Sequence, residues 1–137
     1  MKADDARACI VRDWWDKAEE SLASAERELW AGSLTFAVNR LYYAAFYAAS
    51  AVLLYQGHSF TKHTGVRAAF QSHLVRPGLV EAKWGKLYDR LFEDRQEGDY
   101  IALVSFDPDY VCETLNQVRE LLAVIRPQIA VVFDEPR

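Results

Sequence analysis

The chain of 137 residues is poor in the residues that cross-link small secreted proteins or bind metals and phosphates. Its two cysteines, Cys9 and Cys112, lie far apart and lack metal-ligand spacing, which suits a reducing cytoplasm and two simply packed thiols. The 3 histidines show no HxxxH spacing, so we expect no metal and no cofactor. The 6 glycines and 4 prolines form no glycine-rich phosphate loop.

Long hydrophobic runs are also missing. The longest predominantly apolar run, Leu41 to Tyr55, would span about 22 Å as a helix, whereas the hydrocarbon layer of a membrane is about 30 Å thick. The first residues contain no apolar stretch of the signal-peptide type. We therefore expect a buried helix rather than a membrane span, no membrane partner, and a cytoplasmic protein.

Charge of neither sign dominates. The 16 Lys and Arg residues against 20 Asp and Glu give a net charge of −4, which argues against a non-selective DNA-coating protein. The balance is −3 over residues 1–31, +1 over 32–61, +3 over 62–95 and −5 over 96–137. The basic middle leaves room for a local anion site, although ordinary solvated helix faces are the simpler explanation.

Helical patterning is what the chain has in abundance. Apolar residues recur every three or four positions at about 15–29, 34–55, 80–91 and 111–129, and a shorter helix is expected at 64–75. The second stretch is apolar on nearly all sides, with alanines at 44, 45, 48, 49 and 51, so we expect it to be central. The pattern predicts an all-α bundle of about five helices with short connections. It forms one domain over residues 1–137, with a core at about 14–130 and a loose tail after 132.

Turn and capping residues predict the helix boundaries. Gly32 suits the position after the first helix, and Ser33 suits the N-cap of the second. Asp107 suits the N-cap of the last helix, with Pro108 at its first position. We further expect Thr61 or Thr64 to cap the short third helix, Gly98 to end the fourth helix, and Pro127 to kink or end the last one. Residues 100–106 could pass for a strand but have no partner strand.

Two polar clusters are candidate sites. Arg40, beside Asn39, lies on an aromatic stripe of the most apolar helix. It either pairs with an acid of another helix or binds an anion among aromatic rings. In the second cluster, at 95–100, Arg95 either caps a helix end or joins Asp99 and Tyr100 in a site.

Three segments of the chain together resemble a known family. They are NRLYYAAFYAA at 39–49, KHTGV at 62–66 followed by Phe70, and RQEGDY at 95–100. They resemble, in the same order, the RxxYYAxFYAA helix, the His-Thr/Ser-Gly segment and the RxxxDY turn of small stand-alone prokaryotic HEPN proteins (higher eukaryotes and prokaryotes nucleotide-binding). The resemblance spans about residues 14–130.

This resemblance implies an up-and-down helical bundle that pairs as a homodimer. It also implies a nucleotide or RNA ligand and a nucleotidyltransferase-family partner, because many such proteins are encoded beside a minimal nucleotidyltransferase as a toxin–antitoxin pair. Active HEPN toxins are metal-independent ribonucleases with an arginine followed, after four to six residues, by a histidine. The histidine can move the 2′-hydroxyl proton, and the arginine can stabilise the charge that grows on phosphorus.

The toxin motif of one subgroup, Arg-x4-Tyr-x-His, is incomplete in this chain. Arg95 and Tyr100 match its arginine and the tyrosine that a partner nucleotidyltransferase modifies, but Ala102 stands where the histidine would be. A methyl group cannot transfer a proton, so the resemblance does not extend to the catalytic histidine. His63 either approaches the cleft where two copies of an active HEPN toxin meet or only orders the loop before the third helix.

Three hypotheses remain. We favour a dimeric binding or regulatory protein that holds a nucleotide or RNA phosphate with Asn39, Arg40, Arg95, Asp99 and Tyr100. The second is a ribonuclease toxin, with the catalytic candidates Arg95, Tyr100 and His63, or with His73 in place of His63. Arg67 and His73 repeat an arginine–histidine spacing in the wrong helix, and we interpret that match as chance. The third is a structural module with an interior Arg40–Asp99 ion pair.

Overall fold

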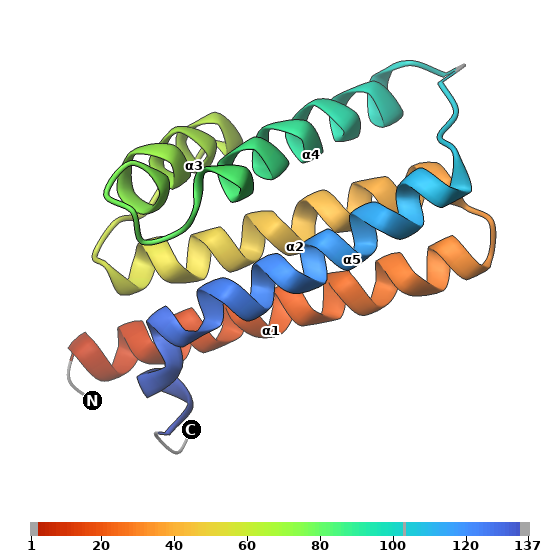
Figure 1. The fold of residues 1–137 in the computed structure, drawn as a ribbon. Coiled ribbons are helices and arrows are strands. Elements are labelled where there is room, and N and C mark those ends of the chain that lie inside the picture. Colours follow the sequence, from red (N-terminus) through yellow and green to blue (C-terminus); the bar gives the residue numbers. More distant parts are fainter. Residues whose placement is uncertain (1–2, 103, 135–137) are drawn as a thin grey trace.

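The computed structural model describes residues 3–102 and 104–134, which form a helical bundle (Figure 1). Its α-helices are, in order, α1 (Ala3–Trp30), α2 (Leu34–Tyr55), α3 (His63–Phe70), α4 (Ala82–Tyr100) and α5 (Pro108–Ile125). A π-helical segment, η1 (Gln71–Val75), continues α3, and a 3₁₀ segment, η2 (Arg126–Phe133), continues α5. The described residues contain no strand, which confirms the all-α prediction.

The helix α2 lies at the centre of the bundle. It packs against α1, α3, α4, α5 and η2, with α1 and α5 on one side and α4 on the other (Figure 1). Its buried residues include alanines 37, 44, 45, 48, 49 and 51, whose short side chains let the neighbouring helices approach closely. The prediction of a central helix at 34–55 is confirmed. No helix of the described residues is both long and apolar enough to cross a membrane.

Several predicted boundaries are confirmed. Gly32 has a φ of 78°, a left-handed conformation that glycine adopts without strain, and it follows the end of α1. Asp107 caps α5 by accepting a hydrogen bond of 2.9 Å from the backbone N–H of Asp109. Regular α-helix ends at Ile125, ahead of Pro127, because proline offers no N–H and its ring crowds the preceding turn.

Other boundary predictions are wrong. Helix α3 begins at His63 with Lys62 at the N-cap, so neither Thr61 nor Thr64 caps it. The prediction of Ser33 as the N-cap of α2, by contrast, is confirmed, although its hydroxyl makes no capping hydrogen bond.

Gly98 does not end α4, which continues to Tyr100. A Cβ at Gly98 would lie 3.2 Å from Cγ2 of Thr35 and 3.3 Å from Cε2 of Phe106. This glycine therefore serves close packing rather than helix termination. The strand-like segment after it contains Leu103, which lies outside the described residues, and of the expected loose tail residues 135–137 also lie outside them.

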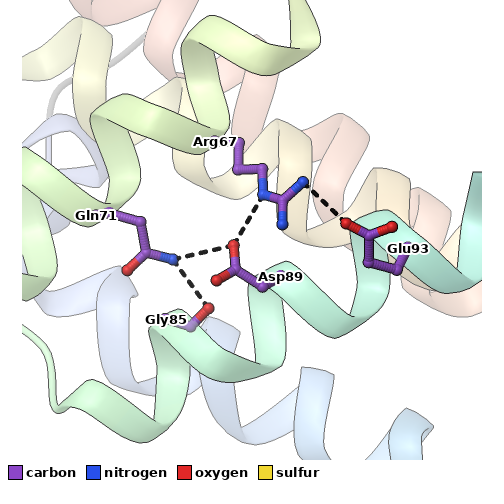
Figure 2. Close-up of polar contacts among 5 residues, drawn as sticks. All are labelled: Arg67, Gln71, Gly85, Asp89 and Glu93. Carbon is purple, nitrogen blue, oxygen red and sulfur yellow. Dashed lines mark hydrogen bonds and ion pairs between the residues drawn. The ribbon is translucent and has the colours of Figure 1, made fainter.

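A second helical glycine, Gly85, lies where α4 touches η1. A Cβ there would lie 2.5 Å from Oε1 of Gln71 and 3.0 Å from Cγ2 of Val75. The side chain of Gln71 donates to the Gly85 carbonyl at 2.9 Å, which ties η1 to α4 (Figure 2). The close approach of the two segments thus requires the absence of a side chain at residue 85.

Replacing Gly85 by alanine should lower the free energy of unfolding. Overpacking costs about 1–3 kcal/mol, of which the better helix propensity of alanine returns at most about 1 kcal/mol. Urea denaturation measures the difference, and the same change in a Gln71→Ala background should cost less because part of the obstruction is gone. A Gly85→Ala protein as stable as its parent would contradict this packing.

Candidate functional site

A chain of polar contacts joins the start of α2 to the end of α4. Arg40 donates from Nη1 to Oδ1 of Asn39 at 2.7 Å. Asn39 donates from Nδ2 to both carboxylate oxygens of Asp99, at 3.3 Å each. Asp99 also pairs with Arg95 one turn earlier in α4, with 3.6 Å between Oδ2 and Nη1. The structure therefore brings together four of the five residues expected to bind a ligand.

Arg95 lies beneath the contacts between Asn39, Arg40 and Asp99, and its side chain is largely shielded from solvent. Its side chain is 12% exposed, and its guanidinium lies over the ring of Tyr42 at 4.8 Å and over that of Tyr43 at 5.9 Å. Its Nε is buried and has no hydrogen-bond partner among the described residues. Arg95 thus packs α4 onto α2 through cation–π contacts, with Asp99 as its counter-ion.

His63, the first residue of α3, is linked to Arg95 through Tyr42, which contacts both side chains. Its Nδ1 lies 2.8 Å from the hydroxyl of the fully buried Tyr42, and its ring stacks on Phe46 with centroids 4.3 Å apart. Burial lowers the pKa of His63 from 6.5, and the positive charge of Arg95 lowers it further. Burial also raises the pKa of Tyr42 to about 12.

The contacts of His63 limit the chemistry it can perform. Because its pKa lies below 6.5 and that of Tyr42 is about 12, both side chains are neutral at pH 7. Nδ1 is engaged by Tyr42 whichever group donates, so Nε2 is the imidazole nitrogen left for a ligand. No interaction places a second acid or base beside His63 within the described residues.

Arg40 is exposed, although it lies on the most buried helix. The expected ion pair with an acid of another helix does not form: no carboxylate pairs with Arg40 in residues 3–102 and 104–134. The hypothesis of an interior ion pair between Arg40 and Asp99 is also wrong, since Asn39 lies between the two side chains and bonds to both. The stripe that Arg40 shares with Phe36, which is 63% exposed, faces outward near the start of α2.

Two surface depressions meet at Asn39 and Arg40. One, the α2–α4 groove, has a volume of about 440 Å³ and is lined by Thr35, Phe36, Asn39, Arg40, Gly98 and Asp99. The other, the α1–α2 hollow, has a volume of about 660 Å³ and is lined by Lys17, Glu20, Ser21, Ser24, Arg27, Asn39, Arg40, Tyr43 and Tyr47. Arg40 can therefore reach a ligand in either one.

Sequence reasoning missed the basic residues that α1 contributes. Lys17 and Arg27 line the α1–α2 hollow, yet residues 1–31 together carry a charge of −3 and were not expected to form an anion site. The spacing of individual residues, rather than the summed charge of the segment, indicates this basic face. Residues 17, 21, 24 and 27 recur every three or four positions and so share a helix face on which Glu20 is the one lining acid.

A third depression, the α4–α5 hollow, is also basic. It has a volume of about 410 Å³ and is lined by Lys83, Trp84, Lys86, Leu87, Arg90, Gln117 and Glu120. Its arginine is already engaged: Arg90 donates to Gln117 and lies over the Tyr110 ring at 5.4 Å. The positive charge over residues 62–95 thus lies partly away from the predicted site.

Tyr100 and Ala102 lie at the far end of α4. Tyr100 is the last residue of the helix and is 76% exposed, so it does not join the polar chain around Asp99. Ala102 is exposed two residues later. The position where the toxin motif carries its histidine is therefore on the surface beyond the helix end.

Arg67 and His73 do not form a catalytic pair. Arg67 forms ion pairs with Asp89 at 2.9 Å and Glu93 at 3.2 Å, as Figure 2 shows. His73 instead stacks on His58 with ring centroids 4.1 Å apart. Arg67 thus ties α3 to α4. Among the described residues no group of three or more His, Cys, Asp or Glu side chains could hold a metal ion.

The pKa of His63 gives a direct check on this arrangement. An NMR titration should place it below 6.5, and Arg95→Gln should raise it without restoring 6.5, because burial is the larger cause. The unfolded chain then binds protons first, so His63 makes folding less favourable as pH falls below 6.5. His58→Gln and His73→Gln, which each remove one of the other two imidazoles, identify the His63 resonance by elimination. A value at or above 6.5 would show that His63 is not buried as described.

Comparisons with known proteins agree with this fold. The HEPN domain family model matches residues 11–128. A UPF0332 protein of Thermotoga maritima is 42% identical over 120 residues, which cover 88% of this chain and 91% of the relative. Two proteins of Methanocaldococcus jannaschii, each named "Putative toxin", are both 30% identical; one match covers 65% of this chain and 60% of the relative, and the other 69% and 75%. The chain belongs to the HEPN domain family.

Proposed function

We propose that this HEPN protein binds the phosphate of a nucleotide or RNA in the α2–α4 groove, as a dimeric binding or regulatory component of a toxin–antitoxin-type system. The observation that carries the proposal is the exposed guanidinium of Arg40, held by Asn39 at the edge of the groove. Because no carboxylate is paired to Arg40 in the described part of the chain, its guanidinium is available to pair with an anion.

The groove offers a matching group for each part of a nucleotide. Arg40 takes the phosphate, and the exposed ring of Phe36 provides an apolar face for a base. The carboxylate of Asp99 can accept a hydrogen bond from a ribose hydroxyl while it holds Asn39 in place. Arg95 acts as a positioning residue, because its ion pair with Asp99 orients that carboxylate from behind the groove.

Dimerisation and a nucleotidyltransferase-family partner belong to the same proposal. They follow from the family resemblance and are supported by exposed aromatic side chains outside the groove: Trp30 is 82% exposed and Tyr100 76%. Aromatic rings of this kind are enriched at protein interfaces. Tyr100, exposed at the end of α4, is accessible to a partner enzyme that modifies a tyrosine.

A ribonuclease toxin is the second candidate. The cluster of His63 with Arg95 favours it, because these are the residue types that cleave RNA without metal, and two relatives carry the name "Putative toxin". The geometry weighs against it, since Nδ1 of His63 is bonded to Tyr42 and Ala102 replaces the motif histidine.

Removing the charge of Arg40 tests the binding function. Arg40→Gln should weaken the binding of AMP about tenfold or more, because a hydrogen bond to a charged group contributes about 1.5–3 kcal/mol. Calorimetric titration of the dissociation constant is the measurement, and Arg76→Gln, which removes an exposed arginine beyond η1, is the matched control. Equal affinities in Arg40→Gln and the parent would refute the groove as the phosphate site.

A cleavage assay separates the two candidates. We expect the purified protein to leave labelled RNA intact in the presence of EDTA, and its expression to leave growth unaffected. Cleavage by the parent protein that is abolished in Arg95→Ala and in His63→Gln, with both variants folded by circular dichroism, would establish the ribonuclease instead.

A further inference from the structure

The α1–α2 hollow continues the surface of the α2–α4 groove on the other side of Arg40. The two depressions share Asn39 and Arg40, and the hollow is the larger, at about 660 Å³ against about 440 Å³. A ligand held by Arg40 therefore has room to extend toward α1. None of the residues that α1 contributes there belongs to the three segments that resemble the HEPN motifs.

Positive charge dominates the hollow. Lys17, Arg27 and Arg40 line it, against Glu20 as the one acid among the lining residues. The nearby Glu26 is paired with Arg119 at 3.4 Å. Neither Arg27 nor Arg40 forms an ion pair in the part of the chain that the structure describes. Three cations that face one depression create a local potential that attracts an anion, despite the net charge of −4.

Aromatic rings lie among these cations. Tyr47 and Tyr43 line the hollow, and Trp14 stacks on Tyr47 with centroids 5.5 Å apart. The ammonium group of Lys17 lies 5.2 Å from the ring centroid of Trp14 and 5.7 Å from that of Tyr47. Phe36 provides a ring on the groove side of Arg40. Aromatic rings and cations that line the same open surface are typical of single-stranded nucleic acid binding.

We propose that the α1–α2 hollow is a second phosphate subsite, and that the ligand is a segment of single-stranded RNA of at least two nucleotides. This inference rests on the proposed function of the groove. The strand passes over Arg40, with one phosphate on the groove side and the next between Lys17 and Arg27. The hydroxyls of Ser21 and Ser24 supply further donors to the second phosphate.

Fluorescence anisotropy with a labelled RNA hexamer, and competition by AMP, test the subsite. The double variant Lys17→Gln/Arg27→Gln should bind the hexamer at least tenfold more weakly and AMP less than threefold more weakly. The slope of log affinity against log salt should become shallower by about 0.7 for each phosphate that the variant no longer neutralises. Lys86→Gln, in the α4–α5 hollow, is the matched control, and melting curves verify that each variant is folded.

Arg40→Gln makes the two proposals separable. If it weakens AMP binding while the double variant binds the hexamer like the parent, the second subsite is refuted and the groove stands. If Arg40→Gln changes neither ligand while the double variant weakens the hexamer, the groove is refuted and the hollow stands. If the double variant weakens AMP and the hexamer equally, the ligand is a single nucleotide and the strand is refuted.

Discussion

The burial of α2 is the constraint on which the rest of the structure depends. Because α1, α3, α4, α5 and η2 all pack against it, its side chains from Leu41 to Leu53 are largely withdrawn from water. Each fully buried leucine there contributes about 1.5–3 kcal/mol of hydrophobic stabilisation. Near the start of the helix one face lacks this cover, because Phe36 and Arg40 are exposed there although Ala37 and Val38 are buried. The position of the candidate site therefore follows from the face of α2 that the neighbouring helices leave open.

The electrostatics of the site depend on how one carboxylate is shared. Asp99 is the counter-ion of Arg95, and it also accepts both hydrogen bonds from Asn39. Arg95 is held by Asp99 and by the ring of Tyr42, so its charge serves mainly to join α4 to α2. Arg40 is one step further along the chain of contacts and bonds only to a neutral amide oxygen. Of the two arginines that the sequence singles out, Arg95 is therefore structural, and Arg40 is the one available to a ligand.

Much of the fold could be predicted because it follows from local rules. The spacing of apolar residues predicted α2, and the residue types at positions 32 and 107 predicted the end of α1 and the start of α5. Gly98 and Gly85 escaped prediction because their role depends on a side chain from a distant segment, such as Thr35 or Gln71.

The site was predictable to a similar extent. The residues that α2 and α4 contribute lie in the family motifs at 39–49 and 95–100, so the sequence predicts them. The exposure of Arg40 and the contribution of Lys17, however, depend on how α1 packs against α2.

Backbone NMR during a titration with AMP can locate the phosphate site, since the chain has a mass of only 15.7 kDa. If the phosphate binds in the α2–α4 groove, the largest chemical-shift changes fall on Asn39, Arg40 and Asp99, which line it. Changes confined to Lys83, Lys86 and Arg90 would place the anion in the α4–α5 hollow and contradict the proposed function.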